Sequence, residues 1–323
     1  MKLASVGTSK IASMFLSAAK KAGGIEYAAA YSRMRETGER FAAENGAARV
    51  YTDLAAMAAS PEIDAVYIAS PNRLHYEQSK LFLEHGKHVF CEKPMTTTCA
   101  EEKELYRIAD EKGLVYAEAI MSIHTPAFRL LQETLQKIGK VRTVNLVFCQ
   151  LSSRYQAYLA GELPNIFDPK LHAGCLMDIG VYNIYLAAAL FGKPEKIVSD
   201  AVFLDSGADA CGSALLKYPD LNVNLIYSKV GQNYAQSEII GDKGTIGIQS
   251  VSQLTGIDLI IGGERRNLVE YEKTRDEVMG AEAAYFRDTV NRGGSPAYTF
   301  ARETSLLVRE ITDEIRKQNA FPF

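Results

Sequence analysis

The sequence predicts an α/β protein with a doubly wound parallel sheet over residues 1–120 and an α+β domain, with an open and mainly antiparallel sheet, over residues 121–323. Short apolar runs alternate with amphipathic stretches in the first part, which is typical of parallel strands joined by helices. The later part contains strands separated by short turns. A chain of 323 residues also exceeds the ~250 residues at which one core stops growing.

The predicted elements of the first part follow each other closely. Strands are expected at 2–6, 26–31, 64–69, 88–91 and 114–119, and helices at 11–22, 36–45, 75–85 and up to residue 112. The last of these helices has the clearest start, because Thr98 and Glu101 form a capping-box pattern, and Gly113 marks its end. Strands that alternate with helices pair in parallel.

The second part has a different rhythm. Helices are expected at 126–138, 175–191, 276–292 and 301–317, with a strand at 141–151 and repeated strands over 196–271. Strands joined by short turns pair antiparallel. An open sheet of this kind needs its exposed face covered, so we expect a homodimer or homotetramer.

Composition excludes several classes of protein. The formal net charge of −3 argues against a nucleic-acid binder. No stretch approaches the ~18 uninterrupted apolar residues of a membrane span, and the N-terminus lacks the apolar core of a secretory signal. The five cysteines form no CxxC pair, which argues against a metal site. We therefore expect a cytoplasmic protein that binds neither membrane nor metal.

A glycine turn follows the first strand. Residues 7–12 read Gly-Thr-Ser-Lys-Ile-Ala and match the pattern G-x-G-x-x-[GA], with Ser9 in place of the second glycine. In a Rossmann domain Gly7 would permit the tight turn, and Ala12 would let the helix pack close to the strand. The pyrophosphate of a dinucleotide would then lie at the helix N-terminus. An ordinary tight turn is the alternative.

The end of the second strand predicts which dinucleotide is bound. An acidic residue at this place holds the ribose 2′-hydroxyl of NAD. Here Ser32 and Arg33 follow the strand, and a hydroxyl with a guanidinium suits a 2′-phosphate. We predict NADP, with NAD as the other possibility. Arg33 as a solvated loop charge is the structural alternative.

Three further segments complete a recognisable pattern: A-S-P-N-R-L-H at 69–75, E-K-P at 92–94 and A-G-C-L-M-D-I-G-V-Y at 173–182. With the glycine turn, they resemble the glucose–fructose oxidoreductase / inositol dehydrogenase (Gfo/Idh/MocA) family over nearly the whole chain. Tyr182, where inositol dehydrogenases often have His, places the resemblance nearest the dimeric dihydrodiol dehydrogenase branch. Ser9, Ala173 and the segment 120–124 depart from the pattern.

The resemblance implies hydride transfer between NAD(P) and a hydroxyl or carbonyl carbon of a sugar, cyclitol or diol. It assigns the catalytic positions to Lys93, Asp178 and Tyr182. The implied cofactor-binding positions are Gly7, Thr8, Ser9, Lys10, Ile11, Ala12, Ser32, Arg33, Ser70, Pro71, Asn72, His75, Glu92, Lys93 and Glu118.

Proton transfer must accompany hydride transfer. Tyr182 has an intrinsic pKa of about 10, which a nearby Lys93 ammonium would lower. We expect Tyr182 as acid and base, Lys93 as its electrostatic activator and Asp178 as an orienting group that pairs with Lys93 or holds a substrate hydroxyl. A rival assignment gives the proton to Lys93 itself. In the structural alternatives Lys93 is a surface lysine, Asp178 a helix cap and Tyr182 a packed core residue.

Two other functions remain open. A non-catalytic dinucleotide-binding regulator or scaffold could be built on the same fold, because fold alone does not imply activity. A reductase or dehydrogenase of a larger aromatic substrate is the other, since Ile120, Met121 and Ile123 are apolar and the resemblance places this segment beside the substrate.

Overall fold

The structure is a computed structural model that describes residues 1–271 and 275–323. Its chain groups into two compact units. The described residues of unit 1 are 1–121 and 275–303, and those of unit 2 are 122–271 and 304–323. Residues 275–303, which the sequence prediction grouped with the second domain, pack with the first unit.

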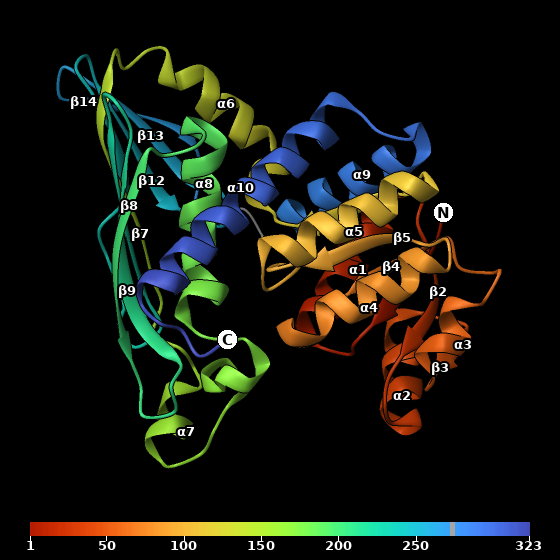
Figure 1. The fold of residues 1–323 in the computed structure, drawn as a ribbon. Helices are drawn as coiled ribbons and strands as arrows, with labels where there is room; N and C mark the ends of the chain where they lie inside the picture. The colour runs from red at the N-terminus through yellow and green to blue at the C-terminus, as the bar shows by residue number, and fades with distance from the viewer. Residues whose placement is uncertain (272–274) are drawn as a thin grey trace. The chain divides into compact units, whose positions relative to one another are not determined.

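Unit 1 contains a six-stranded sheet in the order β3-β2-β1-β4-β5-β6 (Figure 1). Every neighbouring pair is parallel, so the predicted doubly wound parallel sheet is confirmed. The strands are β1 (Lys2–Val6), β2 (Glu26–Tyr31), β3 (Arg49–Tyr51), β4 (Ala65–Ile68), β5 (His88–Glu92) and β6 (Tyr116–Ala119), and the helices between them are α1 (Lys10–Ala22), α2 (Arg35–Asn45), α3 (Leu54–Ala58), α4 (His75–Glu84) and α5 (Cys99–Lys112).

Local sequence explains most of these elements. All four residues of β4 are buried, as expected of a continuous apolar run in a parallel sheet. The capping box of α5 is present, with the Glu101 backbone N–H donating to Thr98 Oγ1 at 3.3 Å and the Thr98 backbone N–H donating to Glu101 at 2.9 Å. β3 and α3 were not predicted, because three and five residues are too few to show a hydrophobic period.

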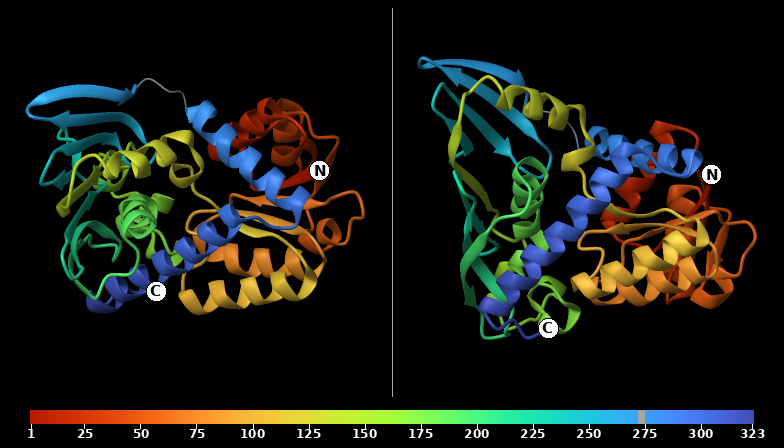
Figure 2. Two further views of the ribbon diagram at one scale, coloured as in Figure 1. Left: turned by 90° about the horizontal axis from the view of Figure 1, so that it is seen from above. Right: turned by 45° about the horizontal axis from the view of Figure 1, so that its top comes forward.

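An aromatic stack forms the centre of unit 1. The rings of Phe15 and Tyr67 are 3.9 Å apart between centroids, and Phe90 stacks on Phe286 at 4.7 Å. Phe286 belongs to α9 (Arg275–Arg292), which packs beside α1 (Figures 1 and 2). Arg287 also donates hydrogen bonds to the carbonyls of Ala22 and Gly23 at the end of α1. A helix distant in sequence thus completes the core of the first unit.

Unit 2 contains an eight-stranded sheet in the order β14-β13-β12-β11-β7-β10-β9-β8. Its pairs are antiparallel except for β7 and β10, which run parallel, so the predicted mainly antiparallel sheet is confirmed. The strands are β7 (Val141–Cys149), β8 (Lys196–Phe203), β9 (Asp209–Lys217), β10 (Asn222–Ser228), β11 (Ser237–Gly241), β12 (Thr245–Ser250), β13 (Thr255–Ile261) and β14 (Glu264–Val269).

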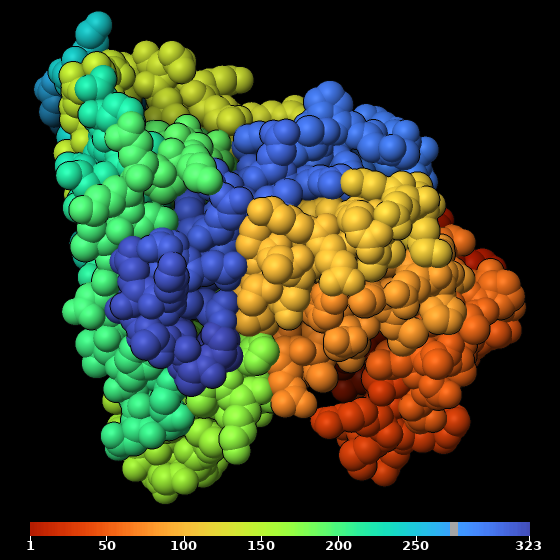
Figure 3. Space-filling view, in the orientation of Figure 1, coloured from red at the N-terminus to blue at the C-terminus, as the bar shows by residue number. Residues whose placement is uncertain are grey.

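Helices cover one face of this sheet. They are α6 (Pro126–Leu135), α8 (Val181–Phe191) and the C-terminal part of α10 (Pro296–Gln318), whereas the short helix α7 (Tyr155–Leu159) lies beyond the end of the sheet (Figure 1). α8 packs on β7 and β10, and the Asn183 amide donates to one carbonyl of each strand. Gln318 bonds to Ser199 of β8, so the chain ends on the surface of unit 2 (Figure 3, dark blue).

Within residues 1–271 and 275–323, one stretch, Pro169–Phe191, has the length and apolar composition of a membrane span. Its central window is 83% buried inside the protein, where α8 is covered by the sheet of unit 2. The apolar character of this stretch is therefore that of a core helix.

The Phe286 stack predicts a large effect of one substitution. Phe286→Ala would remove a fully buried ring, and such changes lower the free energy of unfolding by about 3–5 kcal/mol. Urea denaturation measures this change. Tyr234→Ala is the matched control, because that ring is 95% exposed. Equal stabilities of the two variants would contradict the packing of α9 on unit 1.

Candidate functional site

The turn after β1 lies where the strand order of unit 1 reverses, between β1 and β4. Gly7 has a φ of +106°, and a Cβ added to it would lie 2.7 Å from the carbonyl oxygen of Ala69 at the end of β4. Any side chain would therefore push the two strand ends apart. Open α/β sheets bind ligands at the carboxyl ends of strands at such a reversal.

Ser9 caps the helix that follows. Its hydroxyl accepts a hydrogen bond from the Ala12 backbone N–H at 3.4 Å, and Ala12 itself is fully buried against the sheet. Thr8 lies between Gly7 and this cap, and Lys10 and Ile11 open α1. The first turn of α1 carries no acidic residue. A close turn leading into a helix N-terminus without carboxylates fits a pyrophosphate.

The end of β2 bears the two residues predicted to select the dinucleotide. Ser32 is buried: its N–H donates to the Tyr51 carbonyl, and its hydroxyl accepts from the Met34 N–H at 3.3 Å. Arg33 is exposed, and its neighbour Arg35 lies 3.6 Å from Glu39. Ser32 thus fixes the backbone of the turn, and the guanidinium of Arg33 extends from that turn into solvent.

His75 holds two loops together at the same edge of the sheet. It is fully buried, and its ring nitrogens each lie 2.8 Å from a backbone carbonyl, one of Ser70 and one of Pro94. Burial lowers its pKa. The resemblance implied that His75 lines the cofactor. In the structure its ring is buried between the carbonyls of these two loops.

Residues 70–72 belong to the loop whose Ser70 carbonyl contacts His75. Ser70 donates from its hydroxyl to Gln78 of α4 at 2.6 Å, Pro71 is exposed, and Asn72 begins a single 3-10 turn over Asn72–Leu74.

Glu92 and Glu118 are held by groups of unit 1. Glu92 accepts a hydrogen bond from the hydroxyl of Tyr67 on β4. Glu118 is 4% exposed and accepts the Met95 N–H at 2.8 Å, so it holds the segment after Lys93. Lys93 lies between these anchored positions and is half-buried. Sequence analysis missed Tyr67, because an apolar strand pattern does not show where a tyrosine hydroxyl ends.

In unit 2, Asp178 lies in a π-helical turn over Leu176–Gly180 that leads directly into α8. π-Helical turns are rare and occur frequently at functional sites. Tyr182 follows one turn later and is 5% exposed, with its ring 5.9 Å from that of Phe148. Asp178 and Tyr182 are four residues apart, the first in the π-helical turn and the second at the start of α8.

Asp178 forms an ion pair within its own unit. The Lys229 ammonium lies 2.7 Å from Asp178 Oδ2, with side-chain exposures of 9% and 30%. Sequence analysis predicted Lys93 or a substrate hydroxyl as the partner and missed Lys229. A single lysine after a strand looks like a surface residue, so no local pattern could have found this ion pair.

A second carboxyl lies beneath this turn. Asp209 is 1% exposed and accepts the Leu176 N–H at 2.7 Å. Burial raises the pKa of Asp209 to about 7, and this effect outweighs that of the backbone hydrogen bonds, which lower the pKa. Gly174 has a φ of +136°, and a Cβ there would lie 2.0 Å from Asp209 Oδ1. The glycine of the 173–182 segment is therefore required by Asp209.

Other sites are less suited to a ligand. Among residues 1–271 and 275–323 no group of three or more His, Cys, Asp or Glu side chains could hold a metal ion. Ile120, Met121 and Ile123 are all buried, with exposures of 8% or less.

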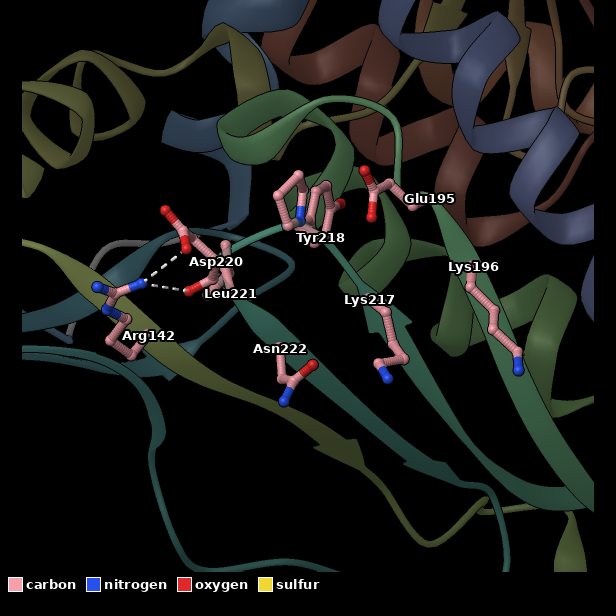
Figure 4. A pocket seen from close by; sticks show the side chains of 9 residues that line it. Arg142, Glu195, Lys196, Lys217, Tyr218, Asp220, Leu221 and Asn222 are labelled. Atoms are coloured by element: carbon pink, nitrogen blue, oxygen red, sulfur yellow. Dashed lines mark hydrogen bonds and ion pairs between the residues drawn. The ribbon is translucent and has the colours of Figure 1, made fainter.

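A hollow of about 570 Å³ lies at one end of the unit 2 sheet (Figure 4). Asp220, on its wall, binds both Lys140 at 2.7 Å and Arg142 at 3.1 Å, so two cations share one carboxylate there. It contains none of the predicted site residues. Its wall is formed by Arg142, Glu195, Lys196, Lys217, Tyr218, Pro219, Asp220, Leu221 and Asn222.

Two family models match the chain. Residues 1–120 match the oxidoreductase family with an NAD-binding Rossmann fold, and residues 128–247 match the Gfo/Idh/MocA C-terminal domain. The scyllo-inositol 2-dehydrogenase (NADP(+)) of Bacillus subtilis is 39% identical over 98% of this chain and 97% of its own. The mouse trans-1,2-dihydrobenzene-1,2-diol dehydrogenase is 29% identical over 86% and 84%. A 3-ketoreductase of Actinomadura kijaniata, solved with NADP and TDP-benzene, shares the fold with a TM-score of 0.86 at 24% identity, over 99% and 98%.

The Gly7 turn predicts the effect of a single methyl group on dinucleotide binding. Gly7→Ala would place a Cβ against Ala69 and force a strained φ that costs about 1–3 kcal/mol. We expect weaker NADPH binding, measured by fluorescence titration. Gly23→Ala at the other end of α1 is the control, because Gly23 has a φ of +73° with nothing within 4 Å of the added Cβ. Weakening by both variants alike would contradict the role of the turn.

The pKa of Asp209 predicts a pH-dependent stability. Folding raises this pKa from 3.8 to about 7, so the folded state binds more protons between these values. The stability that this raised pKa contributes to the folded state is fully present below pH 4. It is lost as the pH rises through 7, and the loss in the free energy of unfolding is at most about 4 kcal/mol. Relative to the parent, Asp209→Asn should therefore gain stability between pH 5 and pH 8. Thermal melts measure this difference, and parallel pH curves for the two proteins would contradict it.

Proposed function

Because the chain belongs to the Gfo/Idh/MocA oxidoreductase family, we propose that it transfers hydride between NADP and a hydroxyl carbon of a cyclic polyol, with scyllo-inositol as the first substrate to test. The chain is an NAD(P)-dependent oxidoreductase. The observation that carries the polyol proposal is that one chain combines the Gly7 turn with Lys93, Asp178 and Tyr182, in a sequence 39% identical to an NADP-dependent inositol dehydrogenase.

The features of unit 1 support NADP as the cofactor. The Gly7 turn and the N-terminus of α1 would hold the pyrophosphate, and Arg33 with Ser32 would meet the adenosine 2′-phosphate. The remaining predicted contacts, from Ser70 to Asn72 and from Glu92, would come from loops that His75 and Tyr67 hold in place. NADP, when bound, accepts or supplies the hydride.

Residues of the chain itself must transfer the proton that accompanies the hydride. We assign it to the hydroxyl of Tyr182, with the Lys93 ammonium stabilising the negative charge that develops on the substrate oxygen. Asp178 would accept a hydrogen bond from a substrate hydroxyl and so orient it. Within its own unit, Asp178 has Lys229 as a cationic partner.

Two alternatives lead to different measurements. If Lys93 carries the proton itself, Tyr182→Phe would keep most of the turnover. A non-catalytic dinucleotide sensor would bind NADP without turnover on any substrate. The buried positions of Ile120, Met121 and Ile123 give no specific support to a larger aromatic substrate.

We also propose that the enzyme is a homo-oligomer located in the cytoplasm. The face of the unit 2 sheet opposite α8 carries exposed apolar side chains, among them Val198, Val202 and Ile226 with exposures of 48%, 60% and 46%. A second copy of the chain would cover them, giving a homodimer or homotetramer. We place the enzyme in the cytoplasm, where its five free cysteines would remain reduced.

Lys93→Ala tests the proposed function directly. We expect kcat for scyllo-inositol oxidation, followed as NADPH absorbance at 340 nm, to fall by about 10³-fold or more, because charge stabilisation in the transition state is lost. NADPH affinity should change little. Lys80→Ala is the matched control, since Lys80 lies on α4 of the same unit in an ion pair with Glu104.

Near-normal turnover of Lys93→Ala would contradict the assignment. Absence of turnover by the parent enzyme with scyllo-inositol, myo-inositol, glucose and a trans-diol would contradict the proposed substrate class.

A further inference from the structure

We infer that Lys229 is a positioning residue of the active site, which fixes the carboxylate of Asp178 in the orientation needed by the substrate. This inference rests on the proposed function, because it assigns Lys229 a role in that same reaction. The Lys229 ammonium contacts Asp178 Oδ2 at 2.7 Å, and no substrate contact of its own is needed.

Burial makes this ion pair different from a surface salt bridge. The Lys229 side chain is 9% exposed, and a nearly buried ammonium is strongly unfavourable unless a charged partner compensates it. Asp178 is 30% exposed, so the protein does not fully enclose its carboxylate. The pair therefore presents a fixed acceptor at the surface of unit 2.

The backbone of Lys229 is fixed on both sides. Its N–H donates to the Ala210 carbonyl at 2.9 Å, and its carbonyl accepts the Ser152 N–H at 2.8 Å. Lys229 is thus anchored to β9 and to the segment after β7, immediately beyond the parallel pairing of β7 with β10. These backbone contacts, together with the burial of its side chain, fix the place from which Lys229 reaches Asp178.

The ion-pair partner of Lys229 is Asp178 and not the nearby Asp209. The Asp209 carboxyl lies beneath the same π-helical turn, where its Oδ2 accepts the Leu176 N–H at 2.7 Å. Burial raises its pKa to about 7, so near neutral pH it is only partly ionised. Asp178 is the carboxylate within salt-bridge distance of Lys229, with Oδ2 2.7 Å from the ammonium.

The geometry also relates this pair to Tyr182. Asp178 lies in the π-helical turn that leads into α8, and Tyr182 is the second residue of α8. A carboxylate fixed by Lys229 and a hydroxyl fixed by α8 would hold two polar groups of the substrate at a set spacing. Displacing such an orienting group by about 1 Å can reduce the rate about 10²-fold.

The test uses the full-length enzyme with NADP⁺ and scyllo-inositol. Lys229→Met should lower kcat by about 10²-fold while NADPH affinity, measured by fluorescence titration, stays within about twofold of the parent. Lys229→Arg keeps a cation beside Asp178 and should restore most of the rate. Lys193→Met is the matched control, because Lys193 forms an exposed ion pair with Glu310 in the same unit.

A double-mutant cycle separates positioning from a general loss of structure. If Lys229 acts through Asp178, the combination of Lys229→Met with Asp178→Asn should be no slower than Asp178→Asn alone. Thermal melts show whether each variant is folded. If Lys229→Met does not fold, Lys229→Gln takes its place in the cycle.

The possible failures can be told apart. Parent-like kcat in the Lys229 variants, additive losses in the cycle, or no recovery with Lys229→Arg would each overturn the inference while the parent enzyme remains active. A parent enzyme that binds NADPH but turns over none of the polyols would instead overturn the proposed function.

Discussion

The close approach of β1 and β4 at the Gly7 turn is the constraint on which the first unit depends. A Cβ at Gly7 would lie 2.7 Å from the Ala69 carbonyl, so the two central strands can end side by side only because the turn has no side chain. Their ends define the point where the strand order reverses, and the loops after β4 and β5 extend from the same edge. The proposed dinucleotide site is a consequence of this backbone contact.

Buried polar contacts then hold the functional loops. The ring nitrogens of His75 lie 2.8 Å from the carbonyls of Ser70 and Pro94, and the Tyr67 hydroxyl donates to Glu92 on the neighbouring strand. In unit 2 the nearly buried Lys229 likewise contacts the more exposed Asp178. Each buried polar group satisfies its own hydrogen-bonding need by fixing a more exposed group beside it. This pattern favours a preorganised catalytic site over an adaptable binding surface.

The sequence predicted the fold better than it predicted the contacts within the site. Alternating apolar runs and helix signals located nearly all strands of the parallel sheet, and the capping box at Thr98 is present as expected. The packing of 275–303 with unit 1 was missed, because a helix pattern does not reveal its partner. Lys229 was missed for a related reason, since it is 51 residues from Asp178 and the two meet where β10 packs against the π-helical turn.

A crystal structure with NADPH and scyllo-inositol would test the central claim most directly. The account predicts the pyrophosphate at the Gly7 turn, the 2′-phosphate beside Arg33, and an inositol hydroxyl within hydrogen-bond distance of both the Lys93 ammonium and the Tyr182 hydroxyl, with Asp178 still bound to Lys229. A dinucleotide bound elsewhere, or an inositol bound away from Lys93 and Tyr182, would contradict it.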